Sequence, residues 1–232
     1  MGNLVVLFDI DGTLLRRAGS THRDALVEAS REVLGVETRN DNIPLHGMLD
    51  QDILLRMLAN AGVGPRRARA ALPAVCRAAE RYYLRHVPDL RGKTCPGVRP
   101  LLGRLRRRGV PLGLVSGNLA RIGWRKLARS GLRPYFGFGI FADMADTRIE
   151  MTTLALRYAA RRGWANGQSR FVLVGDTPND VEAGRANGIE TIGVATGLSS
   201  LEELEAARAS LCAPDLTHAA VARFLFPRAA SR

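Results

Sequence analysis

The sequence predicts an α/β fold in which a largely parallel sheet carries helices on both faces and a helical segment is inserted after the first strand. Three observations lead to this prediction. Short apolar runs alternate with amphipathic helical patterns through most of the chain, which is typical of a parallel sheet. The segment from about residue 20 to about residue 87 contains helical patterns only. With 232 residues, 46% of them hydrophobic, the chain is long enough for one large domain with a smaller insertion.

Four short apolar runs are predicted to be buried strands. They are Leu4–Phe8 (LVVLF), Val110–Val115 (VPLGLV), Phe171–Val174 (FVLV) and Thr191–Ala195 (TIGVA). A fifth run, Gly137–Ala142 (GFGIFA), matches a dinucleotide-binding fingerprint only in its letters, because it would precede a short strand rather than follow one. We interpret this run as a turn.

Most of the helical patterns are closed by a glycine, as helix C-termini commonly are. Between the strands they cover residues 97–109, 118–131, 151–163 and 180–188. In the inserted segment they cover residues 21–35, 48–62 and 65–87, and residues 88–97 return the chain to the sheet. The expected organisation is therefore a core of residues 1–16 and 93–232 with a helical domain of residues 17–92.

The formal net charge of +12 comes almost wholly from arginine, because Lys93 and Lys126 are the only lysines among 34 basic residues. The arginines are spread along predicted helices, where they form solvated faces, and no aromatic residues are interleaved with them. This pattern argues against a nucleic acid as the main partner.

The cysteines and the apolar runs indicate the compartment. Cys76, Cys95 and Cys212 are widely spaced and form no CxxC motif, which suits reduced thiols better than a disulfide framework or a zinc site. Asp9 interrupts the first apolar run, and no later run approaches the length of a membrane span. We expect a soluble, cytoplasmic protein with no membrane partner.

Polar residues gather where three of the predicted strands end. Asp9 and Asp11 follow the first strand, Ser116–Asn118 follow the second, and Asp176 and Asp180 follow the third. Ligands of open parallel sheets bind outside the carboxyl ends of the strands. Carboxylates this close repel one another unless a cation lies among them, and Mg²⁺ suits a site of few carboxylates that keeps several waters. The pattern therefore predicts a Mg²⁺ site.

The same residues predict phosphoryl-transfer chemistry. A carboxylate beside Mg²⁺ can attack phosphorus while the metal neutralises the phosphoryl oxygens and an acid protonates the departing oxygen. Asp9 and Asp11 provide both parts, and Gly12 bends the chain directly after Asp11, which lets that side chain reach a position above the substrate. The Ser116 hydroxyl and the backbone amides at the start of the following helix are natural phosphate ligands.

Three segments in this order resemble motifs of the haloacid dehalogenase (HAD) superfamily of phosphohydrolases. FDIDGTL (residues 8–14), LVSGN (residues 114–118) and VGDTPND (residues 174–180) are similar to its first, second and fourth motifs. The resemblance covers nearly the whole chain: residues 17–92 lie where the family carries its C1 cap, and LHGMLDQDIL (residues 45–54) is similar to a cap segment of the phosphoglycolate-phosphatase-like branch. It implies a Rossmann-like parallel sheet flanked by helices, with a mobile α-helical C1 cap.

The resemblance also implies a role for each motif residue. Asp9 would be the nucleophile that forms an aspartyl-phosphate, and Asp11 would be the general acid/base. The residues that would bind the phosphoryl group are Thr13, Ser116, Gly117 and Asn118. The groups that would hold Mg²⁺ are Asp9, the backbone carbonyl of Asp11 and Asp176, with Asp180 close behind.

The third motif departs from the family. It normally supplies a lysine before the helix that precedes the fourth-motif strand, but no lysine follows Lys126. Arg148 has the right position and a fixed positive charge, so we expect it to take this role, and Lys126 is interpreted as a solvated helix residue. The scattered histidines are expected to have structural or surface roles, with His46 in a cap segment that would face the site. Asp50 and Asp52 open a helix, where carboxylates are favoured whatever the function.

The expected activity is Mg²⁺-dependent hydrolysis of a small anionic phosphomonoester, such as 2-phosphoglycolate or a sugar phosphate. A closed cap would leave room for a small leaving group only, and Arg16 and Arg17 in the hinge would attract anions. Asp11 argues against a haloacid dehalogenase, which lacks the second aspartate. Two alternatives remain open: β-phosphoglucomutase-like phosphoryl transfer, and a catalytically silent HAD-fold binding protein. The oligomeric state, monomer or homodimer, is also open.

Overall fold

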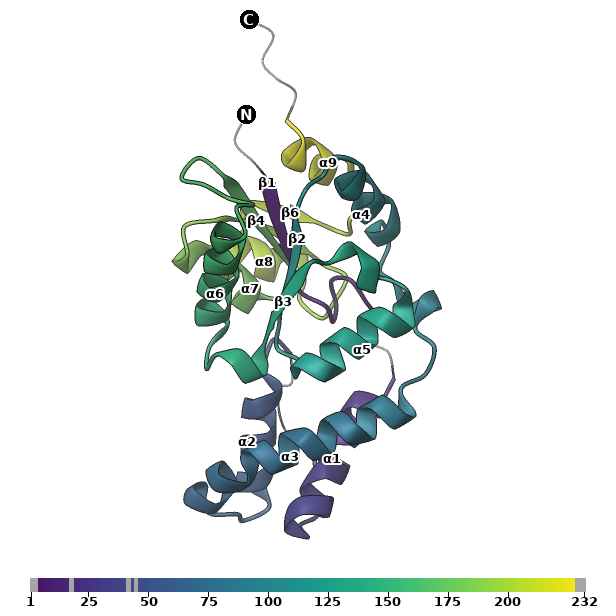
Figure 1. The fold of residues 1–232 in the computed structure, drawn as a ribbon, viewed down its shortest axis with the longest axis vertical. Coiled ribbons are helices and arrows are strands. Elements are labelled where there is room, and N and C mark those ends of the chain that lie inside the picture. Colours follow the sequence, from purple (N-terminus) through teal and green to yellow (C-terminus); the bar gives the residue numbers. More distant parts are fainter. Residues whose placement is uncertain (1–3, 17–18, 41–42, 44–45, 228–232) are drawn as a thin grey trace, which may run out of the picture.

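The core of the molecule is a parallel sheet. The computed structural model describes residues 4–16, 19–40, 43 and 46–227. Within these residues, six strands form one sheet in the order β3-β2-β1-β4-β5-β6, and every neighbouring pair is parallel (Figure 1). The strands are β1 (Leu4–Phe8), β2 (Leu112–Ser116), β3 (Phe138–Phe141), β4 (Arg170–Gly175), β5 (Glu190–Val194) and β6 (Leu211–Ala213). The predicted α/β fold with a parallel sheet is confirmed.

The two edge strands are the elements that the sequence patterns miss. The interpretation of residues 137–142 as a turn is wrong, because β3 occupies this run and pairs with β2. Gly139 is needed there for packing, since a Cβ at this position would collide with the ring of Phe141. At the other edge, β6 has only three residues. The glycines at 137 and 139 interrupt the apolar run of β3, and three residues are too few to show a recognisable apolar pattern in β6.

Helices cover both faces of the sheet, because successive strand residues point to opposite faces. In β1, Val6 and Phe8 belong to the core shared with α4, α5 and α9, whereas Val5 and Leu7 belong to the core shared with α6 and α7. The helices around the sheet are α4 (Val98–Arg107), α5 (Ala120–Ser130), α6 (Arg148–Arg161), α7 (Pro178–Ala186), α8 (Leu201–Ala206) and α9 (Ala219–Leu225). Short 3₁₀ turns lie at Arg91–Lys93, Arg133–Tyr135 and Ala142–Met144.

Three helices lie between β1 and the return of the chain to the sheet. They are α1 (Thr21–Leu34), α2 (Asp50–Asn60) and α3 (Pro65–His86), and α3 packs against both of the others. Figure 1 shows them as a separate layer beyond the carboxyl ends of the strands, next to α5. We call these three helices and their connections the cap. The expected division at residues 16/17 and 92/93 stays a prediction, and Arg17 lies outside the described residues.

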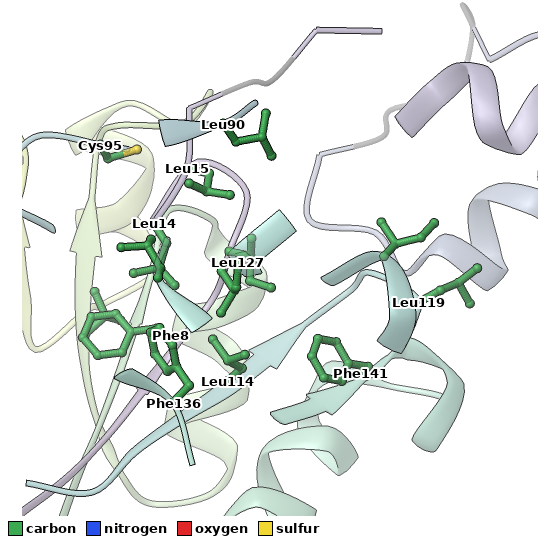
Figure 2. Close-up of a cluster of buried hydrophobic side chains, with 14 of the residues drawn as sticks. Phe8, Leu14, Leu15, Leu90, Cys95, Leu114, Leu119, Leu127, Phe136 and Phe141 are labelled. Atoms are coloured by element: carbon green, nitrogen blue, oxygen red, sulfur yellow. The ribbon is translucent and has the colours of Figure 1, made fainter. Parts of the chain in front are cut away.

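The loop after β1 is anchored to the core by two leucines. Leu14 and Leu15 are fully buried in the same cluster as Leu90 and Cys95 of the return segment (Figure 2). The backbone N–H groups of both leucines donate to the Ile10 carbonyl at 2.9 and 2.8 Å, and Cys95 N–H donates to the Leu14 carbonyl at 3.0 Å. Burial of each leucine contributes about 1.5–3 kcal/mol. The loop that carries the first motif is therefore held rigidly by the core.

In the described part of the chain, no helix combines the length and the apolar character that a membrane crossing requires.

Candidate active site

A cavity of about 620 Å³ lies between the cap and the carboxyl edge of the sheet. The residues predicted for the site that line it are Asp9, Asp11, Ser116, Gly117, Asn118, Arg148 and Asp176. Thr13 and Asp180 lie behind this wall: Thr13 Oγ1 donates to Asp176 Oδ1 at 3.0 Å, and Arg148 Nη1 donates to Asp180 Oδ1 at 2.7 Å. The structure thus brings together all the residues that the sequence predicts for the site.

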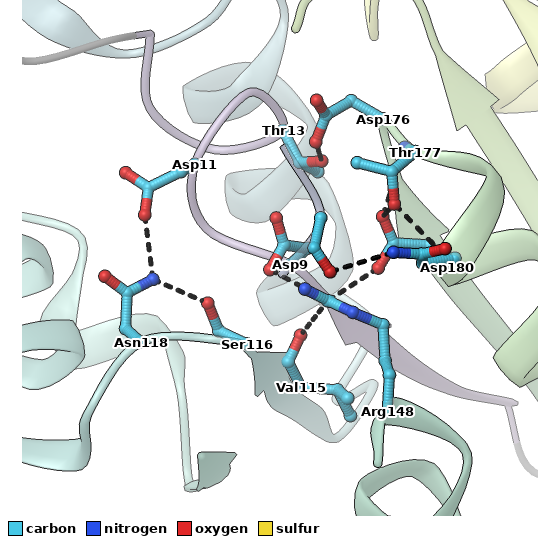
Figure 3. Close-up of polar contacts among 12 residues, drawn as sticks. Asp9, Asp11, Thr13, Val115, Ser116, Asn118, Arg148, Asp176, Thr177 and Asp180 are labelled. Carbon is cyan, nitrogen blue, oxygen red and sulfur yellow. Dashed lines mark hydrogen bonds and ion pairs between the residues drawn. The ribbon is translucent and has the colours of Figure 1, made fainter. Parts of the chain in front are cut away.

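Asp9 lies where β1 ends, and its backbone N–H donates to the Val174 carbonyl of β4 at 2.9 Å. Its side chain is 6% exposed. The guanidinium of Arg148 points at this carboxylate: Nη1 donates to Asp9 Oδ1 at 3.2 Å and also to Asp180 (Figure 3). The same nitrogen lies 3.4 Å from the Val115 carbonyl. Among the described residues, Nη1 of Arg148 thus makes all three of these hydrogen-bond contacts.

Arg148 is held in place against two opposing effects. It is the first residue of α6, which begins here because Thr147 and Glu150 form a capping box, and a helix N-terminus disfavours a cation. Burial acts to lower the pKa of Arg148, but the carboxylates of Asp180 and Asp9 outweigh it and keep this pKa above its ordinary value. The side chain is therefore a fixed positive charge beside Asp9.

Asp180 is oriented by the start of α7. Thr177 N–H and Oγ1 donate to Asp180 Oδ2 at 3.1 and 2.7 Å, and the Asp180 N–H donates back to Thr177 Oγ1 at 3.2 Å. This capping box leaves the other carboxylate oxygen, Oδ1, facing Arg148. The position of Asp180 is thus set by local helix structure as well as by the ion pair.

Asp9, Asp176 and Asp180 form a buried acidic cluster, in which one oxygen from each lies within 4.8 Å of the others. Burial raises the pKa of Asp9 to about 7 and the pKa of Asp176 to about 9, and repulsion from the neighbouring carboxylates adds to both shifts. The Arg148 charge opposes these shifts without cancelling them. The cluster can accommodate a further positive charge.

One oxygen of the cluster has the properties of a metal ligand. Asp176 Oδ2 is buried and has no hydrogen-bond donor among the described residues. Two glycines keep the space around it clear, since a Cβ at either Gly12 or Gly197 would collide with this carboxylate. Buried polar atoms rarely lack a partner, and a hard divalent cation takes carboxylate oxygens of this kind. These residues fit the expected Mg²⁺.

Asp11 lies on the other side of the cavity and is turned away from Asp9, towards Asn118 (Figure 3). Its Oδ2 accepts hydrogen bonds from Asn118 Nδ2 at 2.7 Å and from Lys126 Nζ at 2.5 Å. Burial would raise the pKa of Asp11, but Lys126 and His22 outweigh this effect and hold it below the usual value. Asp11 is therefore an ionised carboxylate in a hydrogen-bonded position.

The interpretation of Lys126 as a solvated helix residue is wrong, because its side chain is only 2% exposed. The helix periodicity contains the reason. Ile122, Lys126 and Ser130 are spaced four residues apart, so they lie on one face of α5, and all three are buried. A lysine on an apolar helix stripe was the sequence signal that could have identified it.

The segment Ser116–Asn118 lies beneath the cap. Asn118 Nδ2 also donates to Ser116 Oγ at 2.8 Å. Gly117 allows the cap to approach, because a Cβ there would collide with the carbonyl of Met48. Two hydrogen bonds of Asp50 hold the cap against the core at this point. Its N–H donates to the Gly117 carbonyl, and its Oδ2 accepts from Leu119 N–H, both at 2.8 Å. The cap thus touches the core at the expected phosphate-binding segment.

The comparisons with known proteins agree with this geometry. Residues 4–188 match the sequence model of the haloacid dehalogenase-like hydrolases. The chain belongs to this family. A phosphoglycolate phosphatase of Synechococcus elongatus is 30% identical over 203 residues, which cover 87% of this chain and 88% of that protein. One of Pseudomonas putida is 29% identical over 221 residues, which cover 91% and 76%.

The fold is shared with solved structures. The structure of a β-phosphoglucomutase from Clostridium difficile matches with a TM-score of 0.71 over 95% of this chain and 96% of that chain, at 18% identity. The predicted HAD membership and the likeness to phosphoglycolate phosphatases are confirmed, and the chain is a HAD-type phosphatase.

In this HAD-type phosphatase, the cap contributes His22, His46 and Asp50 to the cavity wall, and of these the sequence pointed only to His46. His46 lines the cavity, with Nε2 at 2.9 Å from Ser199 Oγ and 4.0 Å from Asp176 Oδ2. His22 and Asp50 also line it and lie 3.0 Å apart. Asp50 was set aside because helix N-termini favour carboxylates in general, and nothing in the local sequence indicates its contact with the core.

Proposed function

We propose that this phosphatase hydrolyses small phosphomonoesters with Mg²⁺ through an aspartyl-phosphate on Asp9, in the manner of a phosphoglycolate phosphatase. The observation that carries the proposal is the separation of two carboxylates by environment. Asp9 is buried beside the fixed charge of Arg148, whereas Asp11 is held on the opposite side of the cavity by Asn118 and Lys126. Two carboxylates with different surroundings can serve as nucleophile and as acid.

The Mg²⁺ would be held by Asp9, Asp176 and the backbone carbonyl of Asp11, with Asp180 close behind. When bound, it supplies positive charge that neutralises the phosphoryl oxygens. The orphaned Asp176 Oδ2 and the space left by Gly12 and Gly197 support this assignment.

The chain's own residues would act in two steps. In the first, an Asp9 oxygen forms a bond to phosphorus while the bond from phosphorus to the ester oxygen breaks. The ionised Asp11 takes the proton that the phosphomonoester monoanion carries and passes it to the departing oxygen. In the second, Asp11 takes a proton from water as the water oxygen attacks the aspartyl-phosphate, which releases phosphate and restores Asp9. Arg148, Thr13 and Ser116–Asn118 would hold the phosphoryl oxygens throughout.

The enclosure of the site supports a small, anionic substrate. The cavity of about 620 Å³ is bounded by cap and core together, and cationic or potentially cationic side chains line it. They are Arg16, His22, Arg23, His46, Lys126 and Arg148. The likeness to phosphoglycolate phosphatases makes 2-phosphoglycolate the first ester to test.

A phosphate-release screen tests the proposal. We expect Mg²⁺-dependent turnover of 2-phosphoglycolate or a sugar phosphate, loss of turnover in EDTA and recovery when Mg²⁺ is added. Asp9→Asn should abolish turnover, whereas Asp146→Asn, which removes an exposed carboxylate, should not. Turnover by Asp9→Asn at near the wild-type rate would exclude the aspartyl-phosphate. Efficient hydrolysis of a phosphopeptide with the small esters inert would exclude the substrate class.

A further inference from the structure

We propose that Lys126 is a positioning residue: from the core helix α5 it orients Asp11 and Asn118 together, and it connects both to the cap through His22. The inference rests on the proposed function, in which Asp11 is the acid for the leaving group. It assigns to a buried lysine a task distinct from that of Arg148, which lies beside Asp9 and Asp180.

The hydrogen bonds of Lys126 separate positioning from substrate binding. An ammonium group has three N–H donors and no acceptor. Lys126 Nζ lies 2.5 Å from Asp11 Oδ2, 2.6 Å from Asn118 Oδ1 and 3.1 Å from His22 Nδ1. These three acceptors use all three donors, so none is left for a phosphoryl oxygen. Lys126 therefore acts on the reaction through its neighbours.

These bonds fix the orientation of Asn118. Because Lys126 can only donate, the atom of Asn118 that faces it must be the carbonyl oxygen, Oδ1. The amide nitrogen then points to Asp11 Oδ2 at 2.7 Å and to Ser116 Oγ at 2.8 Å. The Ser116 hydroxyl accepts this bond, which leaves its own proton to donate to a phosphoryl oxygen. One lysine thus orders the acid and a phosphate-binding hydroxyl.

The same reasoning fixes the ring of His22. Lys126 donates to Nδ1, so the proton of the neutral ring lies on Nε2, which donates to Asp50 Oδ2 at 3.0 Å. His22 belongs to α1 and Asp50 to α2, and Asp50 also accepts from the core at Leu119 N–H. A continuous chain of hydrogen bonds therefore runs from the cap to Asp11 only when cap and core are in contact.

Arg148 and Lys126 contact different carboxylates, Arg148 those of Asp9 and Asp180 and Lys126 that of Asp11. Figure 3 shows Arg148 with Asp9 and Asp180 on one side, and Asp11 with Asn118 and Ser116 on the other. Among the described residues, removal of Lys126 would leave the hydrogen bond from Asn118 to hold the Asp11 carboxylate, and Asn118 itself would lose the group that orients it. A mispositioned acid slows only the reactions that need a proton on the leaving oxygen.

The test compares leaving groups. Lys126→Met keeps the length and apolar stem of the side chain and removes its donors. On 2-phosphoglycolate and glycerol 2-phosphate, whose alkoxide leaving groups need a proton, we expect kcat to fall by roughly 100-fold with KM little changed. On p-nitrophenyl phosphate, whose leaving group needs none, we expect a loss of less than about fivefold. Arg125→Met, an exposed neighbour on α5, serves as the matched control and should match the wild type on every ester.

Two further variants make the outcome decisive. Asp11→Asn should give the same selectivity as Lys126→Met, and Lys126→Ala should recover alkyl-ester turnover when ethylammonium is added. If Asp11→Asn is selective and Lys126→Met slows all esters equally, the positioning role is refuted while the proposed function stands. If Asp11→Asn itself is unselective, the acid assignment fails and the inference fails with it. If Lys126→Met does not fold, His22→Ala is the substitute, because it removes only the cap end of the hydrogen-bond chain. We then expect a smaller loss of kcat that is again confined to alkyl esters. Equal losses on alkyl and aryl esters would refute the connection to the cap.

Discussion

Replacement of Arg148 by alanine is the sharpest perturbation of the surroundings of Asp9, the proposed nucleophile. The side chain is 7% exposed, and its Nη1 contacts Asp9 Oδ1 at 3.2 Å and Asp180 Oδ1 at 2.7 Å. The change removes the fixed positive charge of Arg148 from the acidic cluster of Asp9, Asp176 and Asp180. We expect the variant to lose both folding stability and catalytic turnover, each for its own physical reason.

The size of each loss follows from the burial of the Arg148 side chain. Removal of one partner from a buried ion pair costs about 3 to 5 kcal/mol of folding stability, because the remaining charges are uncompensated. The loss of one charge-assisted contact to the transferring phosphoryl group costs about 2 to 4 kcal/mol of transition-state stabilisation, which corresponds to a fall in kcat of roughly 30- to 1000-fold. Bound Mg²⁺ would offset part of the first cost, because it would bring positive charge to the same carboxylates, but it would not replace the hydrogen bonds that Arg148 would donate to the phosphoryl group.

Arg148→Lys should recover most of the loss. Lysine is a poor substitute where arginine binds through two nitrogens, but here one nitrogen makes all the contacts with Asp9, Asp180 and the Val115 carbonyl. We therefore expect the lysine variant to retain kcat within about tenfold of the wild type.

The assay is phosphate release from the best ester at saturating Mg²⁺, with thermal melting of each variant to confirm that it is folded. Arg157→Ala, which removes an exposed arginine from the same helix, is the control and should retain full activity. A folded Arg148→Ala variant with kcat within about threefold of the wild type would refute the reasoning, because the contact would then contribute less than about 1 kcal/mol.

Three further outcomes are expected. The first concerns the pH dependence of stability in EDTA. Because the pKa values of Asp9 (about 7) and Asp176 (about 9) are raised in the folded protein, the folded state binds protons more tightly than the unfolded state. Their contribution to stability is therefore present at low pH and is lost as the pH rises through these values. Mg²⁺ needs the ionised carboxylates, so the rise in melting temperature that it causes should be larger at pH 9 than at pH 6; the opposite trend would exclude these ligands. Gly197→Ala should weaken Mg²⁺ stabilisation, because its methyl group would collide with Asp176, whereas Gly167→Ala, where a Cβ meets nothing within 4 Å, should not. Burial raises the pKa of Cys76 to about 12 and of Cys95 to about 11, so a thiol reagent at pH 8 should modify only the half-buried Cys212 of the native protein; rapid reaction of all three thiols would contradict this.

Much of the fold and of the candidate site could be predicted from features that are local in the sequence. A strand needs only a short apolar run, and the predicted bounds of β1 coincide with the observed ones. The residues after β1, β2 and β4 meet because parallel strands deliver their carboxyl ends to one edge, so their order along the chain was enough to bring Asp9, Ser116 and Asp176 together. The position of Arg148 was predicted from the resemblance to the family, whose third motif places a cation before the helix that precedes β4.

Tertiary structure alone decided which other groups complete the site. The edge strands β3 and β6 depend on the partner beside them, since a glycine interrupts the apolar pattern of β3 and β6 has only three residues. The contact between Asp50 and Leu119 N–H, and the clearance that Gly197 gives to Asp176, join segments distant in the chain. Lys126 shows the division most clearly: the helix period could have placed it on the buried face of α5, but its acceptors come from the first motif, the second motif and the cap. A charge can be buried only where such partners converge, and that convergence is a property of the folded chain.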